Sequence, residues 1–137
     1  MRKAAKSAAV MAGATALFAT MGTGTANAAT DYYLGNNTTE AGYSFGSIDI
    51  FMRSSLITGT VKSNTTGCAQ VTFRAPEKPL LEETRTACGR GTGTSKGFEF
   101  TLPTNVDGGA SRINIELWTL DSKGDRYHLI DYGIVVR

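Results

Sequence analysis

Only a few residues of this chain have the chemistry that catalysis requires, and their spacing assembles no recognisable active site. His128 is the single histidine among 137 residues. A histidine acts as the general base of a triad when a serine and an acid are positioned beside it, and the sequence assigns neither partner to His128. The alternation around it places this histidine half exposed in a strand. The sequence therefore predicts a protein that is not an enzyme.

Residues 1–28 have the composition of a secretory signal peptide. A basic start precedes a small-residue apolar stretch over 8–18, and the segment ends in Ala26-Asn27-Ala28, a cleavage site of small residues. The apolar stretch is well short of the ~20 residues that a membrane-spanning helix needs. The sequence therefore predicts a secreted, extracellular protein that begins near Ala29 and has no membrane partner.

The charge of the predicted mature chain argues against nucleic acid as a partner. The leader holds Arg2, Lys3 and Lys6, so its removal leaves 11 basic against 12 acidic side chains, a formal charge of −1. The remaining bases are scattered singly, whereas binding to a phosphate backbone needs clustered Lys and Arg. We expect the partners to be other secreted proteins.

The two cysteines, Cys68 and Cys88, are expected to form a disulfide. Export to an oxidising compartment favours a bridge for an even pair, and a zinc site would need ligands that one histidine does not supply. Closing this loop stabilises the fold by roughly 3 kcal/mol. We predict no metal and no cofactor.

The residues that follow Cys68 indicate where its bridge lies. Ala69, Val71 and Phe73 share one face of a strand. If that face is the core, Cys68 points away from it, because successive side chains of a strand alternate in direction. The bridge is then a staple at a sheet edge or onto a covering loop. The alternative is a local bulge that turns Cys68 inward.

Alternation of apolar and polar residues predicts strands throughout residues 44–137. The clearest pair is a hairpin that turns over 121–125. The predicted strands cover residues 47–53, 56–62, 68–74, 84–88, 98–102, 111–120 and 126–136. Seven short strands separated by turns predict an all-β fold, a small antiparallel two-sheet sandwich, with a small closed barrel as the alternative.

One candidate contact surface lies on the predicted strand 111–120. If Ile113 and Ile115 face the core, Trp118 and Leu120 lie on the opposite face among charged neighbours. Exposed aromatic residues in such surroundings are typical of recognition patches. The alternative is that the N-terminal arm or the proline-containing loop covers Trp118.

A second candidate contact is the polar N-terminal arm, residues 29–43, with its apolar cluster Tyr32, Tyr33 and Leu34. Two functions of the arm compete. It either pairs with another protein by strand addition, or it forms an extra edge strand of its own domain. A frayed terminus is the third alternative.

The leader and the compact one-bridge β domain resemble the small secreted proteins of actinobacteria. The order of leader, polar arm over 29–43 and small β domain is also similar to the adaptor subunit of umbrella toxin particles, which joins a large scaffold chain to lectin-bearing subunits. This resemblance concerns overall organisation and not matched residues. It implies a non-catalytic role in a secreted antibacterial assembly.

These observations predict a secreted, non-catalytic protein-binding module, and the resemblance implies the role of an adaptor subunit in an extracellular antibacterial toxin assembly. Its candidate contacts are Tyr32, Tyr33, Leu34, Trp118 and Leu120. One alternative is a secreted inhibitor of a protease or glycosidase, in which Pro76 and Pro79 make the loop between the cysteines rigid. The other is a carbohydrate-binding module with Trp118 as its platform.

Overall fold

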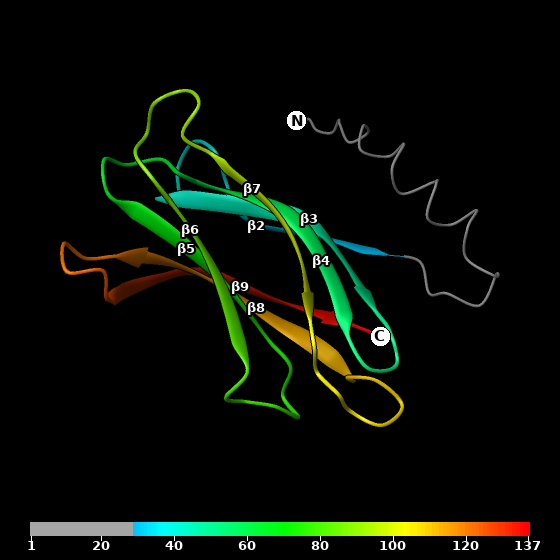
Figure 1. The fold of residues 1–137 in the computed structure, drawn as a ribbon. Helices are drawn as coiled ribbons and strands as arrows, with labels where there is room; N and C mark the ends of the chain where they lie inside the picture. Colours follow the sequence, from blue (N-terminus) through cyan, green and yellow to red (C-terminus); the bar gives the residue numbers. More distant parts are fainter. Residues whose placement is uncertain (1–28) are drawn as a thin grey trace.

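The computed structural model describes residues 29–137, and the predicted signal peptide lies outside the described residues. Eight strands make up this part of the chain, as Figure 1 traces. They are β2 (Thr30–Gly35), β3 (Gly42–Ile50), β4 (Ser55–Ser63), β5 (Cys68–Arg74), β6 (Glu82–Cys88), β7 (Lys96–Leu102), β8 (Arg112–Leu120) and β9 (Arg126–Val136). Residues 29–137 contain no helix of the length and apolarity that a membrane span needs.

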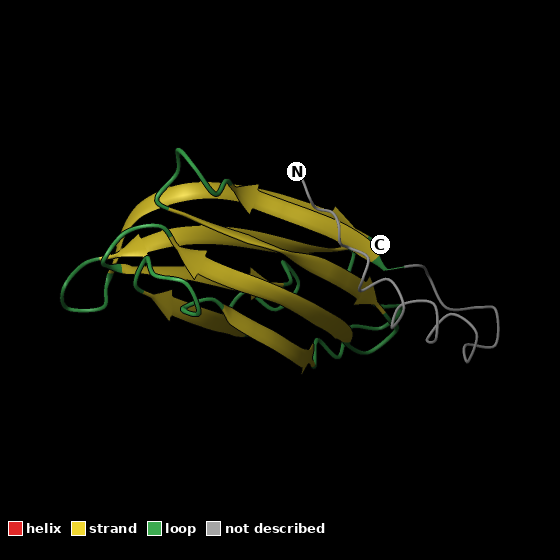
Figure 2. Cartoon of the chain, turned by 90° about the horizontal axis from the view of Figure 1, so that it is seen from above, coloured by secondary structure: helices red, strands yellow, loops and turns green. Residues whose placement is uncertain are grey.

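The strands form two antiparallel sheets of four strands each, which confirms the predicted all-β sandwich. The first sheet has the order β2-β3-β4-β7, and the second has the order β6-β5-β8-β9. Figure 2 shows the two layers stacked on each other. The expected number of strands was too small by one, because β2 lies in the segment expected to be an arm.

The core between the sheets is built from the inward faces of alternating strands. Ile113, Ile115 and Leu117 of β8 are fully buried, as are Val71 and Phe73 of β5. Phe73 lies at the centre, with its ring edge-on to the rings of Tyr32, Phe98 and Phe100. Such edge-to-face contacts are the favoured geometry of aromatic pairs, and they join strands from both sheets.

Of the alternatives for the N-terminal arm, the structure shows the extra edge strand. β2 pairs with β3 along its whole length, with Tyr33 directly opposite Phe45. The pairing begins earlier on β3 than the alternation predicted, at Gly42 rather than residue 47. The inward residues at the start of β3 are Gly42, Ser44 and Gly46, which are too small and polar to give an apolar period.

The small residues of β3 and β4 make room for the ring of Tyr32. Gly46 and Gly59 lie directly opposite each other, and a Cβ atom on Gly59 would lie 2.6 Å from the Tyr32 hydroxyl. That hydroxyl forms a 3.1 Å hydrogen bond with Ser44 Oγ, and Ser44 Oγ donates to the Thr60 carbonyl oxygen at 2.8 Å. Tyr32 therefore fixes β2 to the sandwich by both packing and hydrogen bonding.

The disulfide between Cys68 and Cys88 is present, and it is a staple at a sheet edge as one of the two alternatives predicted. Ala69, Val71 and Phe73 are fully buried, so Cys68 points to the outer face. It lies directly opposite Cys88 on β6, the outermost strand of the second sheet. The bridge therefore ties this edge strand to its neighbour β5.

The two long edges of the sandwich differ in composition. We call β6 and β7 the closed edge, because charged side chains of β6 point inward there. The Arg85 guanidinium lies 4.3 Å from the centre of the Phe100 ring of β7 and forms a 2.9 Å ion pair with Glu83. We call β2 and β9 the open edge, since a groove lined by residues of these two strands separates them.

Candidate functional site

Exposed apolar side chains gather near the open edge. Among residues 29–137, ten large apolar side chains are exposed, and only three of them, Phe51, Met52 and Leu80, lie in loops. The other seven belong to β2, β3 and β9: they are Tyr33, Phe45, Tyr127, Leu129, Tyr132, Ile134 and Val136. The other five strands present no such side chain, and a concentration of exposed apolar side chains is typical of interaction surfaces.

The first group is an aromatic cluster of Tyr33, Tyr43 and Phe45 on the outer face of the first sheet. The three ring centres lie 6.0, 6.1 and 6.4 Å apart, and the ring planes are parallel to within 13°. Tyr33 is 56% exposed and Phe45 is 41% exposed. Because the rings pack against one another, the cluster is rigid before any partner arrives, which lowers the entropy lost on binding.

The surroundings of the aromatic cluster are polar. Thr60 lies opposite Phe45 and Lys62 lies opposite Tyr43 on the neighbouring strand β4. Partial burial, and secondly the electrostatic effect of Tyr33, raise the pKa of Tyr43 above its ordinary value, so the Tyr43 ring stays uncharged at neutral pH. An apolar centre with a polar rim is the usual anatomy of a protein interface.

The second group is an apolar stripe of Tyr132, Ile134 and Val136 on the outer face of the second sheet. These residues lie opposite Glu116, Asn114 and Arg112 of β8, and their exposed fractions are 66%, 52% and 66%. β9 ends the order of its sheet, so no strand within residues 29–137 pairs with its outer edge. β2 of the other sheet lies across the groove, where the Gly35 N–H donates to Asp131 at 2.9 Å. The stripe and the aromatic cluster therefore face opposite sides of the sandwich.

The structure divides the predicted contacts of the arm. Tyr32 and Leu34 are only 9% and 4% exposed, and burial raises the pKa of Tyr32 far above its ordinary value despite the hydrogen bond to Ser44. Both side chains belong to the core, because alternate residues of β2 point inward. Only Tyr33 of this trio offers its side chain to a partner.

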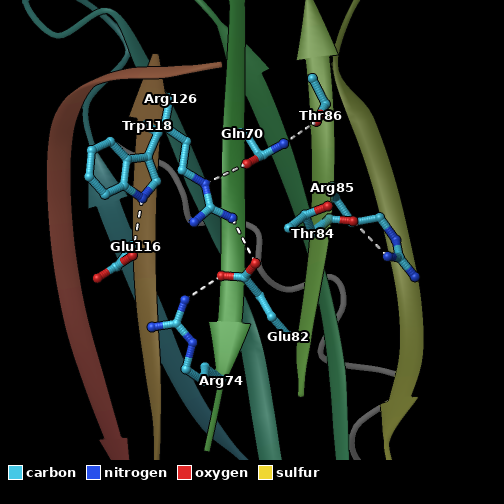
Figure 3. Close-up of polar contacts among 9 residues, drawn as sticks. All are labelled: Gln70, Arg74, Glu82, Thr84, Arg85, Thr86, Glu116, Trp118 and Arg126. Carbon is cyan, nitrogen blue, oxygen red and sulfur yellow. Dashed lines mark hydrogen bonds and ion pairs between the residues drawn. The ribbon is translucent and has the colours of Figure 1, made fainter. Parts of the chain in front are cut away.

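Trp118 and Leu120 lie on the outer face of the second sheet, and both are half-buried. Figure 3 shows Trp118 between two charged side chains: its indole N–H donates to Glu116 at 3.1 Å, and the Arg126 guanidinium lies 5.9 Å from its ring centre. The arm does not cover it, since β2 belongs to the other sheet. Trp118 is thus held in a polar network of its own sheet.

That network crosses all four strands of the second sheet (Figure 3). Arg126 of β9 donates to Gln70 at 3.0 Å and to Glu82 at 2.8 Å, and Arg74 also pairs with Glu82. Burial alone would raise the pKa of Glu82, but the hydrogen bonds and charges of Arg126 and Arg74 outweigh it and hold the pKa below its ordinary value. Thr72 lies between Thr84 and Glu116 on the same face and is 1% exposed.

A nucleophile motif escaped the sequence analysis. Gly42-Tyr43-Ser44-Phe45-Gly46 has the Gly-x-Ser-x-Gly spacing of hydrolases, in which the serine stands exposed on a sharp strand-to-helix turn. Here Ser44 lies inside β3 and is fully buried, and its hydroxyl is hydrogen-bonded to the Tyr32 hydroxyl and the Thr60 carbonyl oxygen. His128 lies exposed on β9 of the other sheet, so this serine lacks the geometry of a nucleophile.

Within residues 29–137 no group of three His, Cys, Asp or Glu side chains is placed to hold a metal ion. Asp121, which brackets the last hairpin turn, accepts hydrogen bonds at 2.9 Å from the backbone N–H groups of Lys123 and Asp125. Its carboxylate therefore stabilises the turn.

No protein-family model matches this sequence, and no curated protein matches it.

Proposed function

We propose that this chain is a secreted, non-catalytic module that binds another secreted protein through the aromatic cluster Tyr33, Tyr43 and Phe45. The observation that carries the proposal is the concentration of exposed apolar side chains on β2, β3 and β9. Large rigid aromatic residues bury much area at little entropic cost and dominate binding energies at interfaces. The disulfide supports export, because such bridges persist in oxidising compartments.

The adaptor role implied by the overall layout is one form of this function. An adaptor joins chains without changing them, and a small sandwich with contact surfaces on opposite faces suits such a task. The aromatic cluster lies on the first sheet and the apolar stripe on the second, so one surface remains accessible when the other is occupied. The partner of the aromatic cluster would then be a second subunit of a secreted assembly.

Co-purification from native culture fluid tests the proposal. We expect tagged protein to recover a reproducible set of co-secreted chains, and Phe45→Ser to weaken their binding about 30-fold, as for an interface hot spot worth ~2 kcal/mol. Phe51→Ser is the matched control, because Phe51 has a similar exposure, 39% against 41%, in a loop away from the cluster. Equal loss in both variants, or retention on polysaccharide with no bound chain, contradicts the proposal.

Enzyme inhibition is a second candidate function, and one observation favours it. The loop between β5 and β6 contains two consecutive turns, closed by Lys78 N–H to Ala75 O at 3.0 Å and Leu81 N–H to Lys78 O at 2.9 Å. Pro76 and Pro79 take the second position of each turn, where their fixed φ is favourable.

These turns hold Leu80 98% exposed, as an inhibitor would hold the residue that enters an enzyme pocket. Titration against a panel of secreted proteases and glycosidases tests this function. Inhibition that Leu80→Ala abolishes would support it, whereas no inhibition of any enzyme in the panel would leave protein binding as the better proposal.

A further inference from the structure

We infer that the free edge of β9 pairs with β9 of a second copy of this chain, so that two sandwiches share one continuous sheet. The pairing would occupy the edge of β9 that carries the apolar stripe. The proposed partner of the aromatic cluster binds the other sheet and leaves this edge free. The inference therefore goes beyond the proposed function and stands or falls independently of it.

The usable part of this edge is short and well defined. Pairing with β8 skips one residue of β9 between Leu129 and Asp131 and another between Arg126 and His128. Such bulges bend a strand and prevent regular pairing. The regular part is therefore residues 131–136, and Arg137 continues it, since its N–H donates to the Ser111 carbonyl oxygen at 3.1 Å.

Charge selects the register of the pair. In an antiparallel pair related by a two-fold axis, residues at equal distances from the centre lie opposite each other on the same face. Centring the pair on Ile134 places Asp131 opposite Arg137 of the second copy, and symmetry repeats this pair. Centring it on Tyr132, Gly133 or Val135 leaves both charges without an opposite charge, so charge complementarity favours Ile134.

The same register gives favourable neighbours on both faces. On the outer face Tyr132 lies opposite Val136, an aromatic with a β-branched residue, and Ile134 lies opposite itself; such cross-strand pairs stabilise sheets. On the inner face Gly133 lies opposite Val135. A Cβ atom on Gly133 would lie 3.1 Å from Leu34 Cδ2, so the glycine leaves room for the core beneath the new pair.

The composition of the edge also favours a second copy. Natural sheets protect free edges with lysine, proline or inward-pointing charges, and β6 carries such charges in Glu83 and Arg85. The regular part of β9 contains neither lysine nor proline. Its single charge, Asp131, also points inward, opposite the buried Leu117, and accepts hydrogen bonds from the Gly35 and Tyr132 N–H groups at 2.9 and 2.8 Å. Unlike Glu83 and Arg85, Asp131 has no ion-pair partner within residues 29–137, and neither does Arg137, whose guanidinium donates to the Gly108 carbonyl oxygen. The strand therefore carries both halves of the required match.

Solution mass and cross-linking test the inference. We expect a dimer in sedimentation experiments. Ile134→Lys, which places two lysines together at the two-fold axis, should leave only monomer, and Arg137→Glu should raise the dissociation constant about tenfold by placing Glu opposite Asp131. Phe45→Ser should leave the dimer intact, which separates this result from the test of partner binding.

Cysteine variants test the register directly. Ile134→Cys alone should form an intermolecular disulfide, because the residue lies opposite itself. Tyr132→Cys and Val136→Cys should each fail alone but cross-link when mixed. Monomer mass at every concentration, as expected for an edge that accepts only a strand of another protein, or a dimer that Ile134→Lys leaves intact, would overturn the inference.

Discussion

The closed edge and the open edge of the sandwich differ in the contacts that hold their strands and in the side chains that they expose. At the closed edge, β6 is tied to β5 by the disulfide, and Arg85 lies over Phe100 with Glu83 beside it. At the open edge, β2 and β9 carry exposed aromatic and β-branched residues and no covalent tie. The covalent tie and the inward-pointing charges therefore lie at one edge, whereas exposed apolar side chains lie at the other.

The largest change in the free energy of unfolding should come from Tyr32, the residue of the open edge that lies in the core. Tyr32 belongs to the open edge but lies in the core, so Tyr32→Ala should lower the free energy of unfolding by about 3–5 kcal/mol. Chemical denaturation measures it. The adjacent Tyr33→Ala is the control and should change the free energy of unfolding by less than about 0.5 kcal/mol, because Tyr33 is exposed. Equal effects would show that β2 is not docked as described.

Removal of the disulfide should have the next largest effect. The Cys68→Ala/Cys88→Ala variant should lose about 3 kcal/mol of unfolding free energy, because the denatured chain gains the entropy of an open loop. Urea unfolding of oxidised wild type and variant measures the difference. Binding at the aromatic cluster should stay unchanged at temperatures where the variant is folded, and a loss of binding there would contradict the division between the edges.

The acid response of the closed edge should depend on Glu82. Its pKa is lowered in the folded protein, so its contribution to stability is present above the unfolded pKa, near 4.5, and is lost as the pH falls through the folded pKa. Glu82→Gln should cost about 1 kcal/mol at neutral pH and flatten this acid loss. Unfolding curves between neutral and acidic pH measure both effects, with the exposed Glu99→Gln as control. If Glu82→Gln lost stability at acidic pH as steeply as the wild type, Glu82 would not be the group responsible for the acid response.

The smallest effect on stability should come from the apolar stripe. Ile134→Lys, measured at concentrations that favour the monomer, should change the free energy of unfolding by less than about 0.5 kcal/mol, since half of the side chain is exposed. Thermal and chemical denaturation give the value. A large loss would mean that this residue supports the single sandwich rather than contacts between chains.

Much of the sandwich was predictable because alternation reports the buried face of a strand. Ile113, Ile115 and Leu117 face the core as expected, β9 has the predicted bounds, and the direction of Cys68 followed from that of its neighbours. These strands pair with neighbours that bury one face uniformly. Local sequence therefore contains the information that fixes them.

The aromatic cluster was missed for a physical reason. Tyr43 and Phe45 point outward, whereas the inward positions between and beside them are Gly42, Ser44 and Gly46. The alternation of apolar and small residues therefore marks the outer face of β3 as if it were the buried one. Only the distant Tyr32 explains those small residues, and its position requires the pairing of β2 with β3. The two aromatic residues at alternate positions before the predicted strand were the available signal.

Arg85 has a consequence for the size of any assembly built by edge pairing. The Arg85 side chain is 33% exposed beside Glu83, so a strand added beside β6 would remove a charged group further from water, which is unfavourable. If two chains joined through β9, their shared second sheet would end in β6 on both sides. Pairing through β9 would then stop at two chains in this sheet instead of continuing along it.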